Sequence, residues 1–424
     1  MLLLLLRSID NKKGYVLLLL LAVVSAPVLA QSSISDYLIS IKNLNQTKLD
    51  SSSLVFLKNY NYNLPFLKSV QFRTESRDLR LKRQEYALRV KPNSLWARSN
   101  QKKIYQRRIE EIQIQNKINF NKTLKERYLQ VVKYIFNDKL IGLYRDRKMH
   151  IEDKLRILSQ SIYDTNFDVK DLIETEEELL STQLKLSNLE EIKLNQQFFL
   201  KEEGSFKNGN VEFKLEDLIG AKQICENAID DPQDIEVLDV TLQKLKLSTL
   251  ESEMKFDVAS TKQLLDYVQA KYGGKNSFLF DENFSISVGI NLPFFGNKRA
   301  NKGSYYLERL SREGKLNESV LDAKRDERMA FDVFKIAISN YESIMAQMEK
   351  SSVVSLLEVY KNMEGVSPLI LLKLRMLQHK KQIEAHKVEN NLYVKYIEAL
   401  ASKEVLFQKP LLNYLSNTLE PLEL

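Results

Sequence analysis

The stretch from Phe284 to Ala300 constrains this chain most, because its hydrophobic period changes within one segment. Apolar residues take alternate positions in its first part: Phe284, Ile286, Val288, Ile290 and Leu292. Polar or small residues stand between them, a pattern typical of a strand with one apolar and one polar face. After Pro293 a long, charged helical pattern begins. The residues 284–292 have about the length that crosses a bilayer as a tilted strand.

This strand has two interpretations. Taken alone, it fits a soluble sheet whose apolar face covers a core. An export signal and a second hairpin in the chain favour lipid contact, because transmembrane barrels alternate apolar-out and polar-in residues. We therefore predict that the five apolar residues face lipid. Trp96, Phe294 and Phe295 lie just beyond strand ends and fit an interfacial aromatic girdle, with burial at a strand–helix corner as the alternative.

The chain consists of two similar halves, a repeat that simplifies its interpretation. In each half a helical segment leads into two strands, then into a rod-like helix, then into a return helix. The hairpins are expected at 67–92 and 263–293, the rods at 97–162 and 298–362, and the return helices at 168–200 and 369–408. Rods of this length extend about 100 Å. The low counts of glycine and proline, 12 and 8, agree with long uninterrupted helices.

These elements set the expected boundaries. The first repeat covers 31–203 with a helical tip at 163–171, and the second covers 233–408 with a tip at 363–369. A connector at 204–232 joins them, and residues 409–424 form a C-terminal tail. The expected fold class is mainly α with a small membrane β part.

The first thirty residues have the features of an export signal. Arg7, Lys12 and Lys13 precede the apolar core Val16–Val24, and Ala30 offers a small residue for cleavage. A membrane-anchoring helix is the alternative, but this core is too short to span a bilayer. We expect residues 1–30 to be removed during export.

Charge and cysteine content exclude several classes of protein. A formal charge of +7 over 424 residues is too mild to indicate nucleic-acid binding. The single cysteine, Cys225, excludes an intrachain disulfide and is expected to be an inert thiol.

The sequence offers no catalytic or metal site. It contains neither a nucleophile-elbow motif nor a phosphate-binding loop, and it has no Cys/His cluster for zinc. His379 and His386 are about 10.5 Å apart along a helix, too far for one ion, and His150 is isolated in the sequence. We expect a protein without enzymatic activity, metal or cofactor.

Four membrane-length strands raise a problem of closure. A barrel needs about eight strands, and an open sheet in lipid leaves its edge groups unpaired. If these strands enter a membrane, several chains must share one barrel. Three chains supply 12 strands, and their rods must then assemble around the same axis.

This pattern resembles the TolC family of outer membrane efflux proteins. The matching segments are FSISVGINLPFFGNKRA at 284–300, KYGGKN at 271–276, DVKDLIETEEELL at 168–180 and GVSPLILLKLRML at 365–377. The resemblance implies a homotrimer with a 12-stranded barrel in the cell outer membrane and an α-helical barrel across the periplasm. It implies a passive exit duct of a tripartite efflux or type I secretion system. The implied partners are a periplasmic adaptor, an inner-membrane transporter and outer membrane lipid.

The resemblance also assigns the two tips to adaptor contact or gating. The residues in question are Asp164, Asn166, Asp168, Asp171, Gly365, Val366, Ser367 and Pro368. Family members often narrow the entrance with acids on the last helix, whereas this chain has Leu369–Leu372 followed by Lys373. Its first tip supplies Asp168, Asp171 and Glu174 instead. An acidic ring, if present, has moved to the first repeat.

A different class of protein shares several of these features. A periplasmic coiled-coil adaptor or scaffold with a soluble β-domain also has an export signal and long helices. It does not require four strands of membrane length with one continuous apolar face. An intracellular coiled-coil protein is a third alternative, which the export signal opposes.

Overall fold

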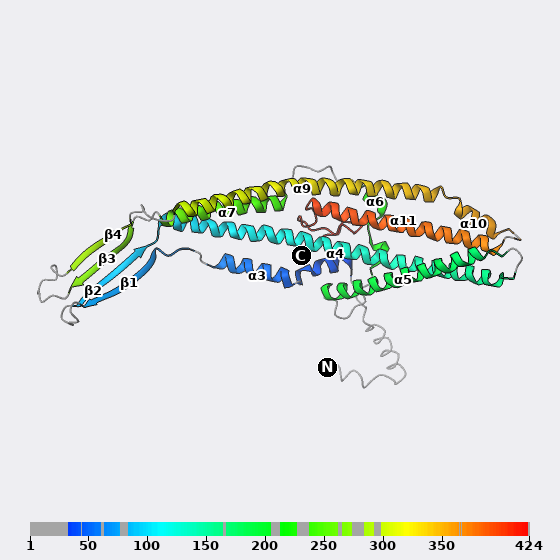
Figure 1. Ribbon diagram of the computed structural model, residues 1–424, viewed down its shortest axis with the longest axis horizontal. Coiled ribbons are helices and arrows are strands. Elements are labelled where there is room, and N and C mark those ends of the chain that lie inside the picture. Colours follow the sequence, from blue (N-terminus) through cyan, green and yellow to red (C-terminus); the bar gives the residue numbers. More distant parts are fainter. Residues whose placement is uncertain are drawn as a thin grey trace, which may run out of the picture.

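The protein is elongated, with a small sheet at one end and long helices over the rest of its length (Figure 1). The computed structural model describes residues 33–43, 45–60, 63–76, 84–163, 167–204, 213–226, 237–261, 265–273, 284–291, 298–363, 365 and 367–422. The expected export signal, residues 1–30, lies outside these ranges.

The elements follow the order expected from the repeat. The first half contains α2 (Ile34–Ile39), the 3-10 helix η2 (Ser40–Asn43), α3 (Asn45–Asn59), β1 (Leu67–Ser76), β2 (Gln84–Pro92), α4 (Leu95–Gln160) and α5 (Val169–Gly204). The 3-10 helix η5 (Leu215–Asp217) and α6 (Ala221–Glu226) follow. The second half contains α7 (Leu238–Thr261), β3 (Leu265–Gly273), β4 (Phe284–Ile290), α9 (Lys298–Glu349), α10 (Val353–Lys361) and α11 (Pro368–Ser402).

Helix α4 is the main rod of the molecule. Its 66 residues contain no proline, and at 1.5 Å per residue they extend about 100 Å. Its start is fixed by Ser94, whose side chain accepts a hydrogen bond from the backbone N–H of Ala97. The helix therefore leaves the sheet at a defined residue and reaches the far end of the molecule.

The second rod is interrupted, contrary to the expectation of one helix over 298–362. Helix α9 ends at Glu349 and α10 begins at Val353. Serine side chains compete with the helical backbone for hydrogen bonds, and here Ser351 accepts one from the N–H of Val353 at 3.4 Å. Lys381 of α11 donates to the same hydroxyl at 2.7 Å. A hydrogen bond therefore connects the break between α9 and α10 to the return helix α11.

The two halves share one antiparallel sheet in the order β1-β2-β3-β4. The two hairpins join through β2 and β3, where Leu88 is opposite Ala270 and Val90 is opposite Val268. Strands β1 and β4 form the edges of the described sheet. Duplicated hairpins from distant parts of the sequence therefore form a single surface (Figure 1).

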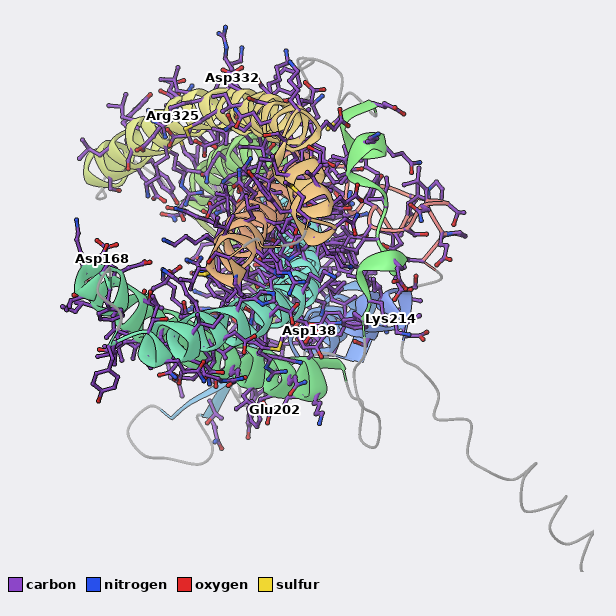
Figure 2. All side chains as sticks on the ribbon, turned by 90° about the vertical axis from the view of Figure 1, so that its right-hand side faces the viewer. Asp138, Asp168, Glu202, Lys214, Arg325 and Asp332 are labelled. Atoms are coloured by element: carbon purple, nitrogen blue, oxygen red, sulfur yellow. The ribbon has the colours of Figure 1, made fainter. Side chains whose placement is uncertain are left out.

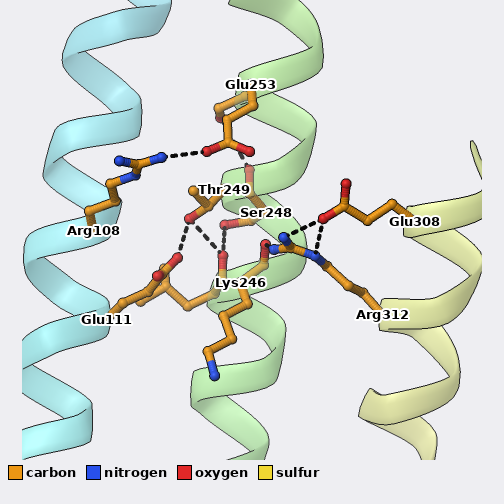
Figure 3. Close-up of polar contacts among 10 residues, drawn as sticks. Arg108, Glu111, Lys246, Ser248, Thr249, Glu253, Glu308 and Arg312 are labelled. Atoms are coloured by element: carbon orange, nitrogen blue, oxygen red, sulfur yellow. Dashed lines mark hydrogen bonds and ion pairs between the residues drawn. The ribbon is translucent and has the colours of Figure 1, made fainter. Parts of the chain in front are cut away.

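Helices α4, α7 and α9 lie side by side (Figure 3), and their sheet-proximal ends meet at the end of the molecule that carries the sheet (Figure 1). Arg108 of α4 pairs with Glu253 of α7 at 2.8 Å, and Thr249 of α7 donates to Glu111 of α4 at 2.5 Å. On the other side of α7, Arg312 of α9 donates to the carbonyl of Lys246 at 2.7 Å. These polar contacts join the first half of the chain to the second.

The main core lies at mid-length, and it includes residues of the expected connector and of the expected C-terminal tail. Ile219 and Ile224, in the expected connector, are completely buried. The C-terminal tail contributes Leu415, and its Leu412 carbonyl accepts a hydrogen bond from the hydroxyl of Tyr128 at 2.9 Å. Arg127 is also buried and donates to the hydroxyl of Ser40 at 2.6 Å. Connector and tail therefore stabilise the middle of the molecule.

Candidate functional site

One face of the sheet is apolar across all four strands. In register, Val70, Val90, Val268 and Val288 form one row, and Phe72, Leu88, Ala270 and Ile286 form the next. Most of these side chains are exposed, and Ile286 reaches 67%. An exposed apolar surface of this kind marks a site of contact with lipid or protein.

The opposite face of the sheet is polar and held by ionic contacts. Arg89 donates to Gln269 at 2.8 Å and lies 4.0 Å from the centre of the Tyr267 ring. Lys271 pairs with Glu85, and Lys91 pairs with Asp266 at 3.4 Å. These side chains come from both hairpins, so the polar face fixes the pairing of β2 with β3.

The structure describes some of the residues that were predicted to contact the membrane and leaves others outside the described ranges. Phe284, Ile286, Val288 and Ile290 are all exposed on the apolar face. Trp96 is 77% exposed at the start of α4, so burial at the strand–helix corner does not occur there. Leu292, Phe294 and Phe295 lie outside the described residues.

The helical tips lie at the other end of the molecule from the sheet (Figure 1). Asp168 is exposed at one margin of the curved helix layer, and its side chain accepts a hydrogen bond from the N–H of Lys170 at 2.9 Å (Figure 2). Asp164, Asn166 and Val366 lie outside the described residues.

The second tip has the features of a helix start after a tight turn. Gly365 has a φ of +85°, a backbone conformation that favours glycine. Ser367 is the N-cap of α11, although its side chain makes no capping hydrogen bond, and Pro368 occupies the first turn. The turn thus returns the chain directly into α11.

Asp171 joins three helices near the tips. Its carboxylate pairs with Lys154 of α4 at 2.8 Å and with Lys373 of α11 at 2.9 Å. The Lys154 side chain is only 8% exposed and that of Asp171 19%, so water screens the pair weakly. Sequence reasoning missed both lysine partners. With two cations beside it, Asp171 is not an unpaired negative charge of an acidic ring.

Further ion pairs continue along the α4–α5 hairpin. Arg147 pairs with Glu178 at 2.5 Å, Arg145 with Glu190 at 2.6 Å, and Lys193 with Asp138 at 2.5 Å. The Arg145–Glu190 pair is largely exposed and contributes little to stability. The pair at Asp171 is the most buried of the series, and it alone also reaches α11.

A histidine pair lies between α4 and α11. The rings of His150 and His379 have centroids 4.9 Å apart, so His150 is not isolated as its place in the sequence indicated. The Nδ1 atoms of both rings are buried and have no hydrogen-bond partner among the described residues. His386 is separate, because its Nε2 contacts the carbonyl of Phe136 at 2.9 Å.

This pair predicts a pH effect on stability. Burial lowers the pKa of His379 below 6.5, His150 lowers it further, Arg147 and Arg375 act in the same direction, and Asp146 opposes them. Because the folded-state pKa is depressed, stability falls as the pH drops below 6.5 and reaches its minimum below the lowered pKa. We expect the Tm to be lower at pH 5 than at pH 7.

The measurement is thermal unfolding of the purified protein at both pH values, with the His379→Gln variant alongside. The variant should lose most of the difference between pH 7 and pH 5. Equal differences in the two proteins would contradict the assignment to this pair.

Among the described residues, no helix combines the length and apolar character that crossing a membrane requires. Within the same part of the chain, no three His, Cys, Asp or Glu side chains come together as a metal site.

Comparisons with known proteins find similarity in structure rather than in sequence. The chain matches no protein-family model. It also matches no curated protein sequence. Solved structures do match over most of the chain.

Three of these structures illustrate the similarity. CusC, which changes conformation during folding and transmembrane channel formation, aligns with a TM-score of 0.64 at 8% identity over 88% of this chain and 92% of its own. The open-state outer membrane channel MtrE of Neisseria gonorrhoeae aligns with a TM-score of 0.61 at 10% identity over 89% of each chain. The outer membrane channel CmeC of Campylobacter jejuni gives 0.60 at 13% identity, over 91% of this chain and 86% of its own.

The similarity extends over 88% to 91% of this chain, so it includes most of both repeated halves. At identities of 8% to 13%, this structural similarity establishes the fold and nothing more. This chain therefore has the fold of the TolC-like outer membrane efflux channels.

Proposed function

We propose that three copies of this chain form a channel-tunnel in the outer membrane, extending into the periplasm. The apolar face of the sheet carries this proposal. Four strands from two separate hairpins present aligned apolar rows outward, while the other face is polar and ion-paired. Transmembrane barrels have this arrangement, with lipid on one side and water on the other.

The edges of the sheet support a shared barrel. Strands β1 and β4 have one neighbour each in the described sheet, so their outer backbone groups need partners in lipid. Pairing β4 of one copy with β1 of the next closes the ring and satisfies both edges. Three copies give 12 strands, more than the roughly eight strands whose interior side chains alone can fill.

The helices support a shared tube. Seen along the long axis, they form a curved layer with Asp168 of α5 and Arg325 of α9 at its margins (Figure 2). Both helices carry exposed apolar side chains: Val169, Ile173, Leu180 and Leu184 on α5, and Leu307, Leu310 and Leu321 on α9. Such surfaces are typical of contacts between subunits. Margin-to-margin packing of three copies would cover them.

The duct is passive and acts as the exit of a tripartite efflux or type I secretion system. Its tips, at 163–171 and 363–369, meet a periplasmic adaptor and through it an inner-membrane transporter. The tip residues Asp168, Gly365, Ser367 and Pro368 belong to this contact, and the triad of Asp171, Lys154 and Lys373 holds the entrance together.

Cell fractionation and mass determination of the detergent-extracted protein test this function. The expected result is an outer membrane protein with about three times the mass of the processed chain. Release as a soluble periplasmic protein without detergent would refute the channel. The sheet would then belong to a soluble β-domain of an adaptor or scaffold.

A further inference from the structure

An open pocket of about 1270 Å³ lies where the sheet meets the helices. It is lined by the start of β1, the end of β2, the start of β3, the first turns of α4 and α9, and the last turns of α7. Its volume exceeds the 300–1,000 Å³ typical of a pocket for one small ligand. Its lining residue Leu265 is paired across β3 and β4 with Ile290 of the apolar sheet face.

One wall of the pocket is apolar, and local contacts fix the position of its side chains. Phe66, Leu95 and Trp96 line it, and all three are strongly exposed. The Arg98 guanidinium lies 4.2 Å from the centre of the Phe66 ring, and the N–H of Asn93 donates to the carbonyl of Phe66 at 2.7 Å.

The helix start fixes the other two side chains of this wall. Ser94 caps α4 through the N–H of Ala97, so Leu95 and Trp96 occupy the first helical positions. The apolar wall is therefore preorganised by local contacts.

The other wall of the pocket is basic. Lys255 of α7 and Lys302 of α9 line it and are exposed, and Arg309 lies beside them. Among the described residues of the lining, Glu251 is the one acid; it is 4.0 Å from Arg309, which also pairs with Glu313 at 2.8 Å. The two lysines thus leave positive charge at the margin of an apolar surface.

We propose that this pocket binds an anionic phospholipid, with an acyl chain along Phe66, Leu95 and Trp96 and the phosphate at Lys255 and Lys302. The inference rests on the proposed function, because it places the base of the sheet at the membrane surface. Lysines near an anionic headgroup attract it. A free phosphate would leave the apolar wall of the pocket uncovered, whereas an acyl chain covers it. A second copy packed here would have to supply acids to both lysines.

Trp96 provides a direct readout, because it is the only tryptophan in the chain. The full-length processed protein is extracted in detergent, and its fluorescence is titrated with phospholipids that carry bromine on the acyl chain. Bromine quenches only a tryptophan in contact with that chain. The two probes are brominated phosphatidylglycerol, which is anionic, and brominated phosphatidylcholine, which is zwitterionic.

The expected result is half-maximal quenching at a mole fraction about tenfold lower for the anionic lipid. The double variant Lys255→Gln/Lys302→Gln should lose this preference. The matched control Lys103→Gln/Lys117→Gln removes two exposed lysines of α4 that do not line the pocket, and it should keep the preference.

Three outcomes would overturn the proposal. They are equal quenching by both lipids, a preference that survives in the pocket variant, and a tryptophan that neither lipid reaches because a second copy covers it. The mass of the same sample separates these failures from failure of the channel. A membrane-extracted trimer without lipid preference refutes only the pocket, whereas a soluble monomer refutes the proposed function.

Discussion

Replacing Asp171 with asparagine is expected to raise the leak conductance of the channel in a planar bilayer. The substitution removes the charge that Lys154 and Lys373 share, and it leaves Lys154 nearly buried without an ionic partner. Breaking a buried ion pair from one side costs about 3 kcal/mol. If this contact holds the tips of α4, α5 and α11 together, the population of opened tips rises about a hundredfold.

Two matched variants separate this contact from a simple effect of negative charge. Glu174→Gln removes an acid that pairs with Lys170 at 3.7 Å, with both side chains exposed to water. This variant should leave the conductance unchanged. Asp168→Asn removes an exposed acid at the helix start, which an acidic ring would require and the three-helix contact does not. Unchanged conductance in Asp171→Asn would refute the contact as a latch.

The same contact should persist over the physiological pH range. The hydrogen bond from Lys154 is the main cause that lowers the pKa of Asp171 below 3.8, and Lys373 adds to it, while burial acts in the opposite direction. Because the folded-state pKa is depressed, the stabilisation is complete above pH 3.8. It is lost as the pH falls through the lowered pKa.

Much of the fold could be predicted, because the hydrophobic patterns of its strands and of its long helices are strong and depend only on neighbouring residues. Alternation in 284–290 correctly placed the apolar residues of β4 on one face, and the absence of proline predicted the long helix α4. Pairing of β2 with β3 was not readable, since it depends on contacts such as Arg89 with Gln269, 180 residues apart. The break before α10 was missed because serines occur within helices as well as at their ends.

The candidate site was harder to predict than the fold. Asp171 was identified from its position, but its role depends on Lys373, far away in the sequence. Lys154 was not readable either: it lies six residues before the end of α4, whereas Asp171 lies two residues after the start of α5, so counting equally from the turn does not pair them. The contact of His150 with His379 required the packing of α4 on α11, which no local pattern reveals.

The substitution Ile286→Arg is expected to abolish outer membrane assembly. Ile286 is at the centre of β4 on the apolar face and is 67% exposed. An arginine on the lipid face near the bilayer midplane costs about 2–4 kcal/mol. The proposed trimer would carry the change three times, and the total of about 6–12 kcal/mol is comparable with the stability of a whole domain.

The neighbouring position provides the matched control, because Ser287 belongs to the polar face of the same strand, opposite Gln269. Ser287→Arg should assemble in normal yield and change the conductance of the channel, since substitutions toward the lumen alter selectivity. The measurement is the yield of detergent-extracted trimer from the outer membrane for both variants. Equal yields would contradict lipid contact. A soluble β-domain would reverse the effect, because an arginine replacing an exposed isoleucine would then improve solubility without affecting the fold.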